Sequence, residues 1–203
     1  GAGEIVTLTP TSTILKTCYV DQQTGNIVAR VDEHDFVERV ARADLVAALE
    51  GDYSAIVVSS YDKGFLTDDD IALIAWEAKG RGIPSFLDTK RVLGAFSRYV
   101  TFVKINQREY DTNIKAGVFP ADFCDNLIVT LGGKGARWVN GNETEFSVDP
   151  VAVADLSGAG DTFLAALVVA YLQNGNNVFK AIGYANAAAR IAVSKRGVVA
   201  VAR

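Results

Sequence analysis

Histidine, cysteine and methionine are scarce in this 203-residue sequence, which has one His, two Cys and no Met. A single histidine argues against a histidine-based zinc site and against a Ser-His-Asp triad. Cys18 and Cys124 are isolated and lack the spacing of metal ligands, which favours a reduced, cytoplasmic protein. Because Met is missing and the chain starts Gly1-Ala2-Gly3, we expect a piece of a longer protein or a processed chain.

Long apolar runs and an excess of basic charge are also lacking. No run reaches the roughly 20 residues of a membrane-spanning helix, and no signal peptide is visible. The net charge of −4 argues against nucleic acid or a membrane surface as the main partner. The length and the 49% hydrophobic content allow one sizeable core, so one domain is expected.

The most informative stretch is D-L-S-G-A-G-D-T-F at residues 155–163, a glycine turn before an apolar run predicted to be a buried helix. Backbone N–H groups at a helix start, together with the helix dipole, form a site for an anion such as phosphate. A carboxylate there, Asp161, suits the removal of a proton from a hydroxyl that attacks phosphorus. The alternative is that Asp161 only caps the helix, and the local residues leave these two interpretations about even.

The stretch resembles the signature D-x-[ST]-G-A-G-D-T-F of the ribokinase-like sugar kinases, also called the phosphofructokinase B family. The resemblance implies that Asp161 is the catalytic base and that the amides of Gly158, Ala159 and Gly160 form the anion hole. It also implies ATP and Mg²⁺ as cofactors, and it leaves room for a monovalent cation such as K⁺ near Asp155.

Three further segments resemble family motifs and follow the family's order. N-x-x-E at residues 106–109 resembles the magnesium motif, in which Asn106 and Glu109 act through water; plain helix capping is the alternative. V-T-L-G-x-x-G at residues 129–135 resembles the nucleotide loop, and A-N-x-x-A at residues 185–189 resembles the adenine side of that pocket, completed by Gly197 and Val198. The nucleotide-site residues implied by the resemblance are Asn106, Thr130, Gly132, Gly133, Gly135, Asn186 and Gly197.

Two lysines are candidate phosphate contacts. Lys63 lies in S-Y-D-K-G, which resembles the D-Y-x-K-G loop of heptose kinases with the leading Asp shifted; an exposed loop lysine is an equal alternative. Lys90 lies in D-T-K, which resembles the family's D-x-K. Residues 11–32 resemble a heptose-kinase segment in which Cys18 replaces Arg, and there Lys16 and Arg30 are weaker candidates for substrate binding.

The pattern of strands and helices predicts an α/β fold, a ribokinase-like three-layer αβα arrangement with a mostly parallel central sheet. A small β-hairpin or lid element is expected near the N-terminus, from strands at 14–20 and 27–31. We expect helices at 35–49, 67–80, 163–172 and 178–194, and strands at 54–60, 85–88, 99–105, 126–130, 136–140 and 144–148. We make no assignment for 113–125.

The resemblance covers about residues 11–200 and is nearest to heptose-7-phosphate kinases. It implies transfer of the ATP γ-phosphoryl group to a hydroxyl of a sugar or sugar phosphate. It also implies that residues 1–203 are a single kinase domain lacking the family's N-terminal third, with a lid-associated segment at 12–32 and a nucleotide-binding core at 33–203. A homodimer, or a partner chain that supplies the absent part, is expected. Two alternatives stay open: a non-catalytic ATP-binding fragment or scaffold, and a ribokinase-like kinase for another sugar, sugar acid or nucleoside.

Overall fold

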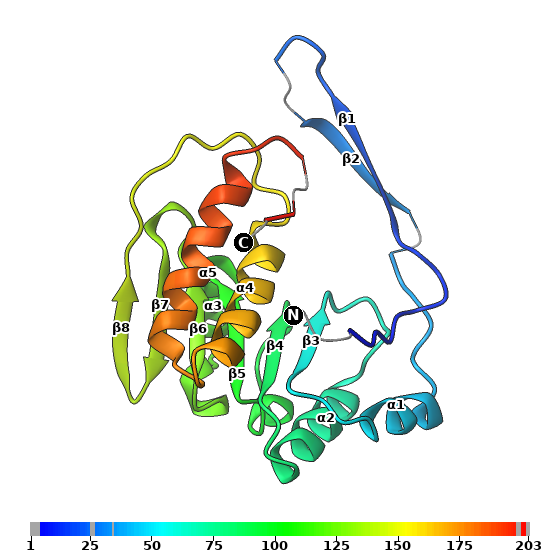
Figure 1. Cartoon of the computed structure of the whole chain (residues 1–203). Helices are drawn as coiled ribbons and strands as arrows, with labels where there is room; N and C mark the ends of the chain where they lie inside the picture. Colours follow the sequence, from blue (N-terminus) through cyan, green and yellow to red (C-terminus); the bar gives the residue numbers. More distant parts are fainter. Residues whose placement is uncertain (1–4, 25–26, 34, 198–199, 202–203) are drawn as a thin grey trace.

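A six-stranded sheet is the centre of the structure, a computed structural model that describes residues 5–24, 27–33, 35–197 and 200–201 (Figure 1). Its strand order is β3-β4-β5-β6-β7-β8. The first four strands are parallel and the last two are antiparallel, which confirms the predicted mostly parallel sheet of an α/β fold. The strands are β3 (Ile56–Ser60), β4 (Ser85–Thr89), β5 (Phe102–Asn106), β6 (Leu127–Thr130), β7 (Ala136–Asn140) and β8 (Asn142–Phe146).

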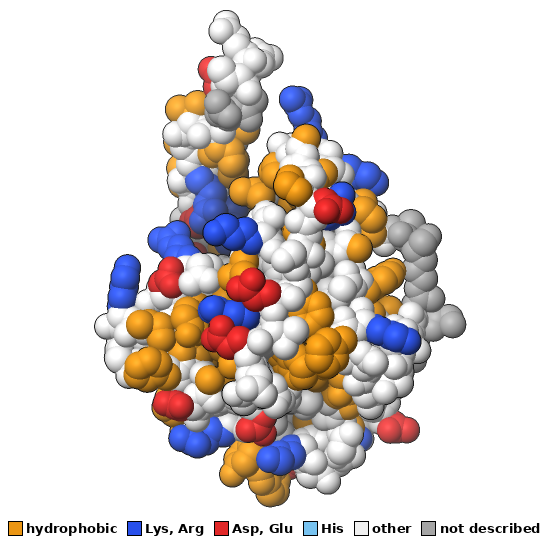
Figure 2. Space-filling model, turned by 90° about the vertical axis from the view of Figure 1, so that its left-hand side faces the viewer, with side chains coloured by type: hydrophobic (Ala, Val, Ile, Leu, Met, Phe, Trp, Pro, Cys, Tyr) orange, Lys and Arg blue, Asp and Glu red, His pale blue; other side chains and the backbone are white. Residues whose placement is uncertain are grey.

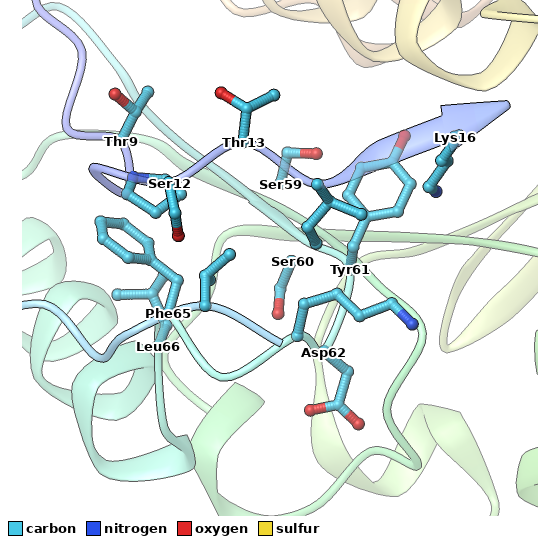
Figure 3. Close-up of a pocket in the computed structure, with 14 residues that line it drawn as sticks. Thr9, Ser12, Thr13, Lys16, Ser59, Ser60, Tyr61, Asp62, Phe65 and Leu66 are labelled. Atoms are coloured by element: carbon cyan, nitrogen blue, oxygen red, sulfur yellow. The ribbon is translucent and has the colours of Figure 1, made fainter. Parts of the chain in front are cut away.

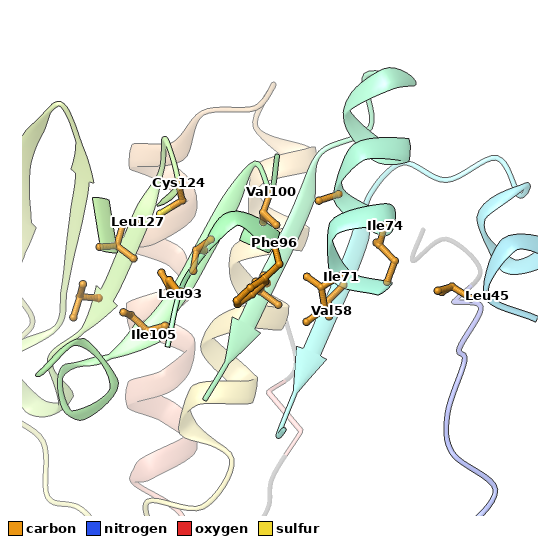
Figure 4. Packing of buried hydrophobic residues seen from close by; sticks show 14 of the residues in the cluster. Leu45, Val58, Ile71, Ile74, Leu93, Phe96, Val100, Ile105, Cys124 and Leu127 are labelled. Atoms are coloured by element: carbon orange, nitrogen blue, oxygen red, sulfur yellow. The ribbon is translucent and has the colours of Figure 1, made fainter. Parts of the chain in front are cut away.

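Helices cover both faces of this sheet and bury the central strands on both sides, as parallel strands require. On one face, α2 (Asp68–Gly80) and α3 (Gln107–Lys115) cover the sheet, and Leu45 of α1 (Arg42–Leu49) joins the same hydrophobic cluster, which includes Ile105 of β5 (Figure 4). On the other face, α4 (Ala159–Gln173) and α5 (Val178–Val193) pack on Phe86 and Ile128. Within the described ranges, no helix is both long and apolar enough to cross a membrane.

The predicted N-terminal hairpin is confirmed as a separate two-stranded sheet, β1 (Leu15–Val20) paired with β2 (Ile27–Glu33). It projects from the body and carries hydrophobic side chains on its surface (Figure 2). Leu15, Val20, Ile27 and Val28 are each more than half exposed. The hairpin therefore stands outside the main core.

The helix predicted at residues 35–49 is wrong in its first half, because α1 begins only at Arg42. The N–H of Val37 donates to the carbonyl of Lys63 at 2.8 Å, and that of Val40 donates to Phe65 at 3.0 Å. Residues 35–41 thus bond to the loop after β3 instead of forming a helix. Val37 and Val40 are still buried, so the apolar spacing predicted the burial of these residues correctly but their helical conformation wrongly.

An ion pair fastens this segment to α2. The Arg39 guanidinium donates to both carboxylate oxygens of the buried Asp70, at 3.0 and 2.8 Å. Asp70 also completes a capping box with Thr67, the predicted cap of α2. Burial alone would raise the pKa of Asp70, but the hydrogen bonds from Arg39 and Thr67 hold it well below its usual range.

Several predicted boundaries differ from the structure by a few residues. Strand β3 starts at Ile56 and β5 at Phe102, later than predicted. Strand β8 starts at Asn142, two residues before the predicted 144, because Gly141, with a φ of 67°, reverses the chain by itself. The unassigned stretch 113–125 contains the end of α3 and a 3₁₀ turn at Pro120–Phe123.

Candidate active site

Three hollows lie at the carboxyl ends of the parallel strands, where open α/β sheets bind ligands. The outer hollow, of about 510 Å³, lies between the start of β1 and the loop after β3 (Figure 3). The middle hollow, of about 170 Å³, is lined from β3, β4, β5 and the start of α4. The inner hollow, of about 240 Å³, lies between the loop after β6 and helices α4 and α5. Tyr61 lines both the outer and the middle hollow, and Gly160 lines both the middle and the inner hollow.

The glycine turn at the start of α4 lies beside the middle and inner hollows. Gly158 is the N-cap residue, with a φ of 74° that an L side chain rarely adopts. The N–H of Ala159 donates to the carbonyl of Leu156 at 3.3 Å and is therefore engaged. Among the residues that the structure describes, the N–H groups of Gly158, Gly160 and Asp161 donate to no acceptor. Of the three amides expected to form the anion hole, those of Gly158 and Gly160 are therefore available to an anion, and the amide of Asp161 joins them.

Asp161 lies in the first turn of α4 but does not cap it. The N-cap is Gly158, and no side chain caps this helix end. The Asp161 carboxylate instead accepts from the Tyr61 hydroxyl, 3.1 Å from Oδ1 and 3.3 Å from Oδ2. It lines the middle hollow, where a proton acceptor would meet an incoming hydroxyl.

Lys104 on β5 lies directly beneath the glycine turn, and sequence reasoning missed it. Its Nζ is 2.7 Å from Oδ2 of Asp88 on the neighbouring strand β4, and only 4% of Lys104 is exposed. A Cβ on Gly160 would lie 3.0 Å from this Nζ. Burial raises the pKa of Asp88, although the Lys104 ammonium opposes this shift. A lysine inside the apolar strand F-V-K-I-N was the signal available in the sequence.

Asn106 and Glu109 form a capping box at the start of α3, so the alternative weighed for N-x-x-E is realised. The Asn106 Oδ1 accepts from the N–H of Glu109 at 2.9 Å, and Glu109 Oε2 accepts from the N–H of Asn106 at 2.7 Å. The other Glu109 oxygen, Oε1, is 3.4 Å from the Nζ of Lys90. Both residues and Lys90 line the middle hollow.

This geometry fits a magnesium ion held mainly by nucleotide phosphates and water. In the described part of the chain, no group of three His, Cys, Asp or Glu residues could cage a metal. Mg²⁺ commonly keeps several waters and uses one or two carboxylates plus substrate phosphates. Glu109 Oε1, which takes no part in the capping box and lies 3.4 Å from the Nζ of Lys90, is a protein oxygen suited to such a water-mediated contact.

The inner hollow brings together most of the residues proposed to bind the nucleotide. Thr130, Gly132, Gly133 and Gly135 line it from the loop after β6, and Asn186 lines it from α5. Asn186 is buried, and its Nδ2 donates to the carbonyl of Phe146 at 3.0 Å. The structure thus joins two segments that lie about fifty residues apart in the sequence.

Gly135 allows the nucleotide loop to pass beside β8. Its φ is 98°, and a Cβ there would lie 2.0 Å from the carbonyl oxygen of Phe146. We expect Gly135→Ala to cost about 2 kcal/mol of stability and to weaken ATP binding, because the loop must move. Chemical denaturation and calorimetric titration with ATP measure the two effects. Gly133→Ala is the matched control for stability, since its Cβ would meet nothing within 4 Å; an equal loss of stability in both variants would contradict the explanation.

The remaining candidates are dispersed. Lys16 and Lys63 line the outer hollow, where Lys63 pairs with Asp35. Arg30 pairs with Asp32 on the exposed hairpin and lines none of the three hollows.

Gly197 also lines none of these hollows and donates its N–H to Asp155 Oδ2 at 3.1 Å. The N–H of Ser157 donates to Oδ1 of the same carboxylate, and these backbone hydrogen bonds lower the pKa of Asp155. Val198 is outside the described residues.

Comparison with known proteins gives the family. The model for the pfkB family carbohydrate kinases matches residues 5–202. The bifunctional protein HldE of Azorhizobium caulinodans is 34% identical over 209 residues, which cover 96% of this chain and 43% of that protein. The bifunctional protein HldE of Campylobacter jejuni is 32% identical over 192 residues, covering 86% of this chain and 41% of that protein. The chain therefore spans less than half the length of these curated relatives.

A solved structure gives the fold independently. Arabidopsis thaliana ribokinase, complexed with ribose and ATP, superposes with a TM-score of 0.66 at 22% identity, over 87% of this chain and 62% of that one. At this identity the likeness concerns the fold alone. With a family model that matches nearly the whole sequence, the chain belongs to the pfkB family of carbohydrate kinases.

Proposed function

We propose that this protein transfers the γ-phosphoryl group of ATP to a hydroxyl group of a sugar phosphate, with heptose 7-phosphate as the acceptor. The observation that carries the proposal is the sequence of three adjoining hollows, with Gly160 shared by the inner pair and Tyr61 by the outer pair. A nucleotide in the inner hollow and an acceptor in the outer one would meet in the middle hollow, beside Asp161. Phosphoryl transfer depends mainly on such positioning and on charge stabilisation.

In the proposed reaction, Asp161 takes the proton of the acceptor hydroxyl. The hydroxyl oxygen forms a bond to the γ-phosphorus while the bond from that phosphorus to the β–γ bridging oxygen breaks, and ADP leaves. The N–H groups of Gly160 and Asp161, at the positive end of α4, stabilise the charge on the moving group. Lys104 and Lys90 add positive charge around the same space. Bound Mg²⁺ would supply further charge neutralisation at the phosphates.

The acceptor class is inferred from the outer hollow and from the relatives. Lys16 and Lys63 bring two ammonium groups to this hollow, which suits an acceptor that carries its own phosphate. The resemblance of residues 11–32 and 60–64 to heptose kinases, and the HldE relatives, favour a heptose phosphate over a free sugar.

We also propose a monovalent cation as a cofactor and a second protein chain as a partner. Potassium is proposed because Escherichia coli phosphofructokinase-2, a structural neighbour with a TM-score of 0.65 at 18% identity, was solved in complex with potassium. A homodimer, or a partner chain beside the β3 edge, is proposed from the family.

A substrate panel tests the proposal. ATP consumption is measured with a heptose 7-phosphate, a fructose phosphate, a deoxy-sugar acid and a nucleoside, and ATP binding is measured separately by calorimetry. We expect turnover with the heptose phosphate to exceed that with the others. Turnover with another acceptor would change the substrate class, and ATP binding without any turnover would favour the non-catalytic alternative.

A further inference from the structure

A tyrosine forms the partition between the outer and the middle hollow. We propose that Tyr61 is a positioning residue for phosphoryl transfer, whose hydroxyl holds the Asp161 carboxylate in the orientation that receives the acceptor's proton. This inference rests on the proposed function, because it takes Asp161 as the base. It adds a residue that the sequence motifs did not assign to the site.

The hydrogen bonds to Asp161 are the first support. The Tyr61 Oη lies 3.1 Å from Oδ1 and 3.3 Å from Oδ2, so one hydroxyl faces both carboxylate oxygens. The two residues are 100 positions apart and come from different elements, the loop after β3 and the first turn of α4. A donor shared by both oxygens restrains rotation of the carboxylate, which no helix cap restrains here.

The ring of Tyr61 is itself held in place. The Nζ of Lys16 lies 5.3 Å from the ring centroid and the Nζ of Lys90 lies 5.1 Å from it, both within the range of a cation–π interaction. Figure 3 shows the ring beside Lys16, at the wall of the outer hollow. Lys16 comes from β1 and Lys90 from the segment after β4, so the ring joins the hairpin to the body. This arrangement fixes the phenol where the two hollows meet.

The loop that carries Tyr61 is anchored by its other residues. Arg91 lies 2.8 Å from the Asp62 carboxylate, donates to the carbonyl of Leu66 at 2.6 Å, and also pairs with Asp68. The carbonyl of Lys63 accepts from Val37. Asp62 has a φ of 56°, a left-handed conformation that these bonds maintain. The position of Tyr61 is therefore supported by the contacts of its neighbours in the loop.

Electrostatics keep the phenol protonated. Burial raises the pKa of Tyr61 to about 12, and the negative charges of Asp161, Asp88 and Glu109 add to this shift. Lys16 and Lys90 are the cations that face the ring. At neutral pH the Tyr61 hydroxyl therefore keeps its proton and can donate it in a hydrogen bond to the Asp161 carboxylate.

A kinetic comparison tests the role in catalysis. Tyr61→Phe keeps the ring and its lysine contacts and removes only the donor, so we expect kcat to fall about tenfold to a hundredfold while the KM for ATP stays unchanged. Tyr99→Phe is the matched control, because Tyr99 also has a lysine ammonium over its ring, at 4.9 Å, but lines none of the three hollows. A wild-type kcat in Tyr61→Phe, or a fall of kcat matched by an equal rise in the KM for ATP, would overturn the proposal.

A spectroscopic comparison tests the contact without relying on turnover. A fluorinated tyrosine that titrates nearer neutral pH is placed at position 61, and its ¹⁹F chemical shift reports ionisation of the phenol. We expect Asp161→Asn to lower the pKa of this phenol, whereas Asp122→Asn, which neutralises an exposed carboxylate elsewhere, leaves it unchanged. An unchanged pKa in Asp161→Asn would overturn the proposal. A wild-type protein without turnover on any acceptor would defeat the proposed function, and this second comparison would still decide whether Tyr61 holds Asp161.

Discussion

We expect Asp161→Asn to lose turnover by about a hundredfold or more while ATP still binds with near wild-type affinity. The side chain lies in the middle hollow, while the inner hollow proposed for the nucleotide is lined by other residues. An amide cannot take the proton of an attacking hydroxyl, and removal of a general base costs about 10²–10⁴-fold in rate. Steady-state kinetics with the acceptor found in the panel, together with calorimetric titration of ATP, provide the measurement.

The stability of α4 should fall by no more than about 1 kcal/mol in this variant, the contribution of a first-turn charge to the helix dipole, because Gly158 is the N-cap and Asp161 makes no capping bond. Asp122→Asn is the charge-matched control and should keep both kcat and ATP affinity. Near-normal turnover in Asp161→Asn would refute the assignment of Asp161 as the base. Loss of ATP binding in parallel with turnover would show that the carboxylate acts in the nucleotide pocket instead.

The second large effect is expected at Lys104. We expect Lys104→Met to cost about 3 kcal/mol of unfolding free energy, the lower end for a buried ion pair, since it leaves the largely buried Asp88 carboxylate without its cation. Methionine fills most of the lysine volume, so the loss of charge pairing dominates over a cavity. Chemical denaturation at neutral pH measures the change, and Lys115→Met, at an exposed lysine on α3, is the control.

The pH dependence of this loss has a definite sign. The folded-state pKa of Asp88 is already raised by burial, and removal of Lys104 raises it further. Below its ordinary pKa this carboxyl group is protonated in both the folded and the unfolded state, and it costs no stability. As the pH rises through the raised folded-state pKa, the carboxyl group ionises in the folded protein and destabilises it. The difference in stability between Lys104→Met and the wild type should therefore shrink as the pH falls. Lys104→Met combined with Asp88→Asn should recover most of the loss at neutral pH, and a double variant as unstable as the single one would contradict the ion-pair explanation.

Local sequence patterns predicted helices and strands best where contacts between neighbouring residues in the sequence decide the conformation. The cap of α2 by Thr67 and its acidic first turn are contained in four consecutive residues, and the structure matches them. The buried strands β4 and β6 were predicted because a short apolar run bounded by turn residues is typical of a buried strand in an α/β sequence. Residues 35–41 show the limit of this reasoning, because their helical apolar spacing is satisfied by backbone bonds to the loop after β3.

The two capping alternatives show the same limit at the site. Asp161 and Glu109 each lie near the start of a helix that follows a glycine or asparagine, and each allowed a capping or a functional role. The structure gives Glu109 a capping box with Asn106, while Asp161 turns to the Tyr61 hydroxyl. The difference depends on whether a distant donor competes with the helix's own N–H groups, and a local window does not contain that donor.

By itself, the sequence determined that an apolar helix follows a glycine turn, that parallel strands precede it, and that the motifs follow the order of a carbohydrate kinase. The first two features depend on residues within a few positions of one another, where backbone preferences and apolar spacing act directly. The third is a resemblance to a family, carried by the motif residues themselves. Only the tertiary structure decided that Tyr61 meets Asp161, that Lys104 lies with Asp88 beneath Gly160, and that the amides of Gly160 and Asp161 stay open. Those contacts follow from the order of strands in the sheet, which brings residues 16 to 100 positions apart to the same carboxyl edge.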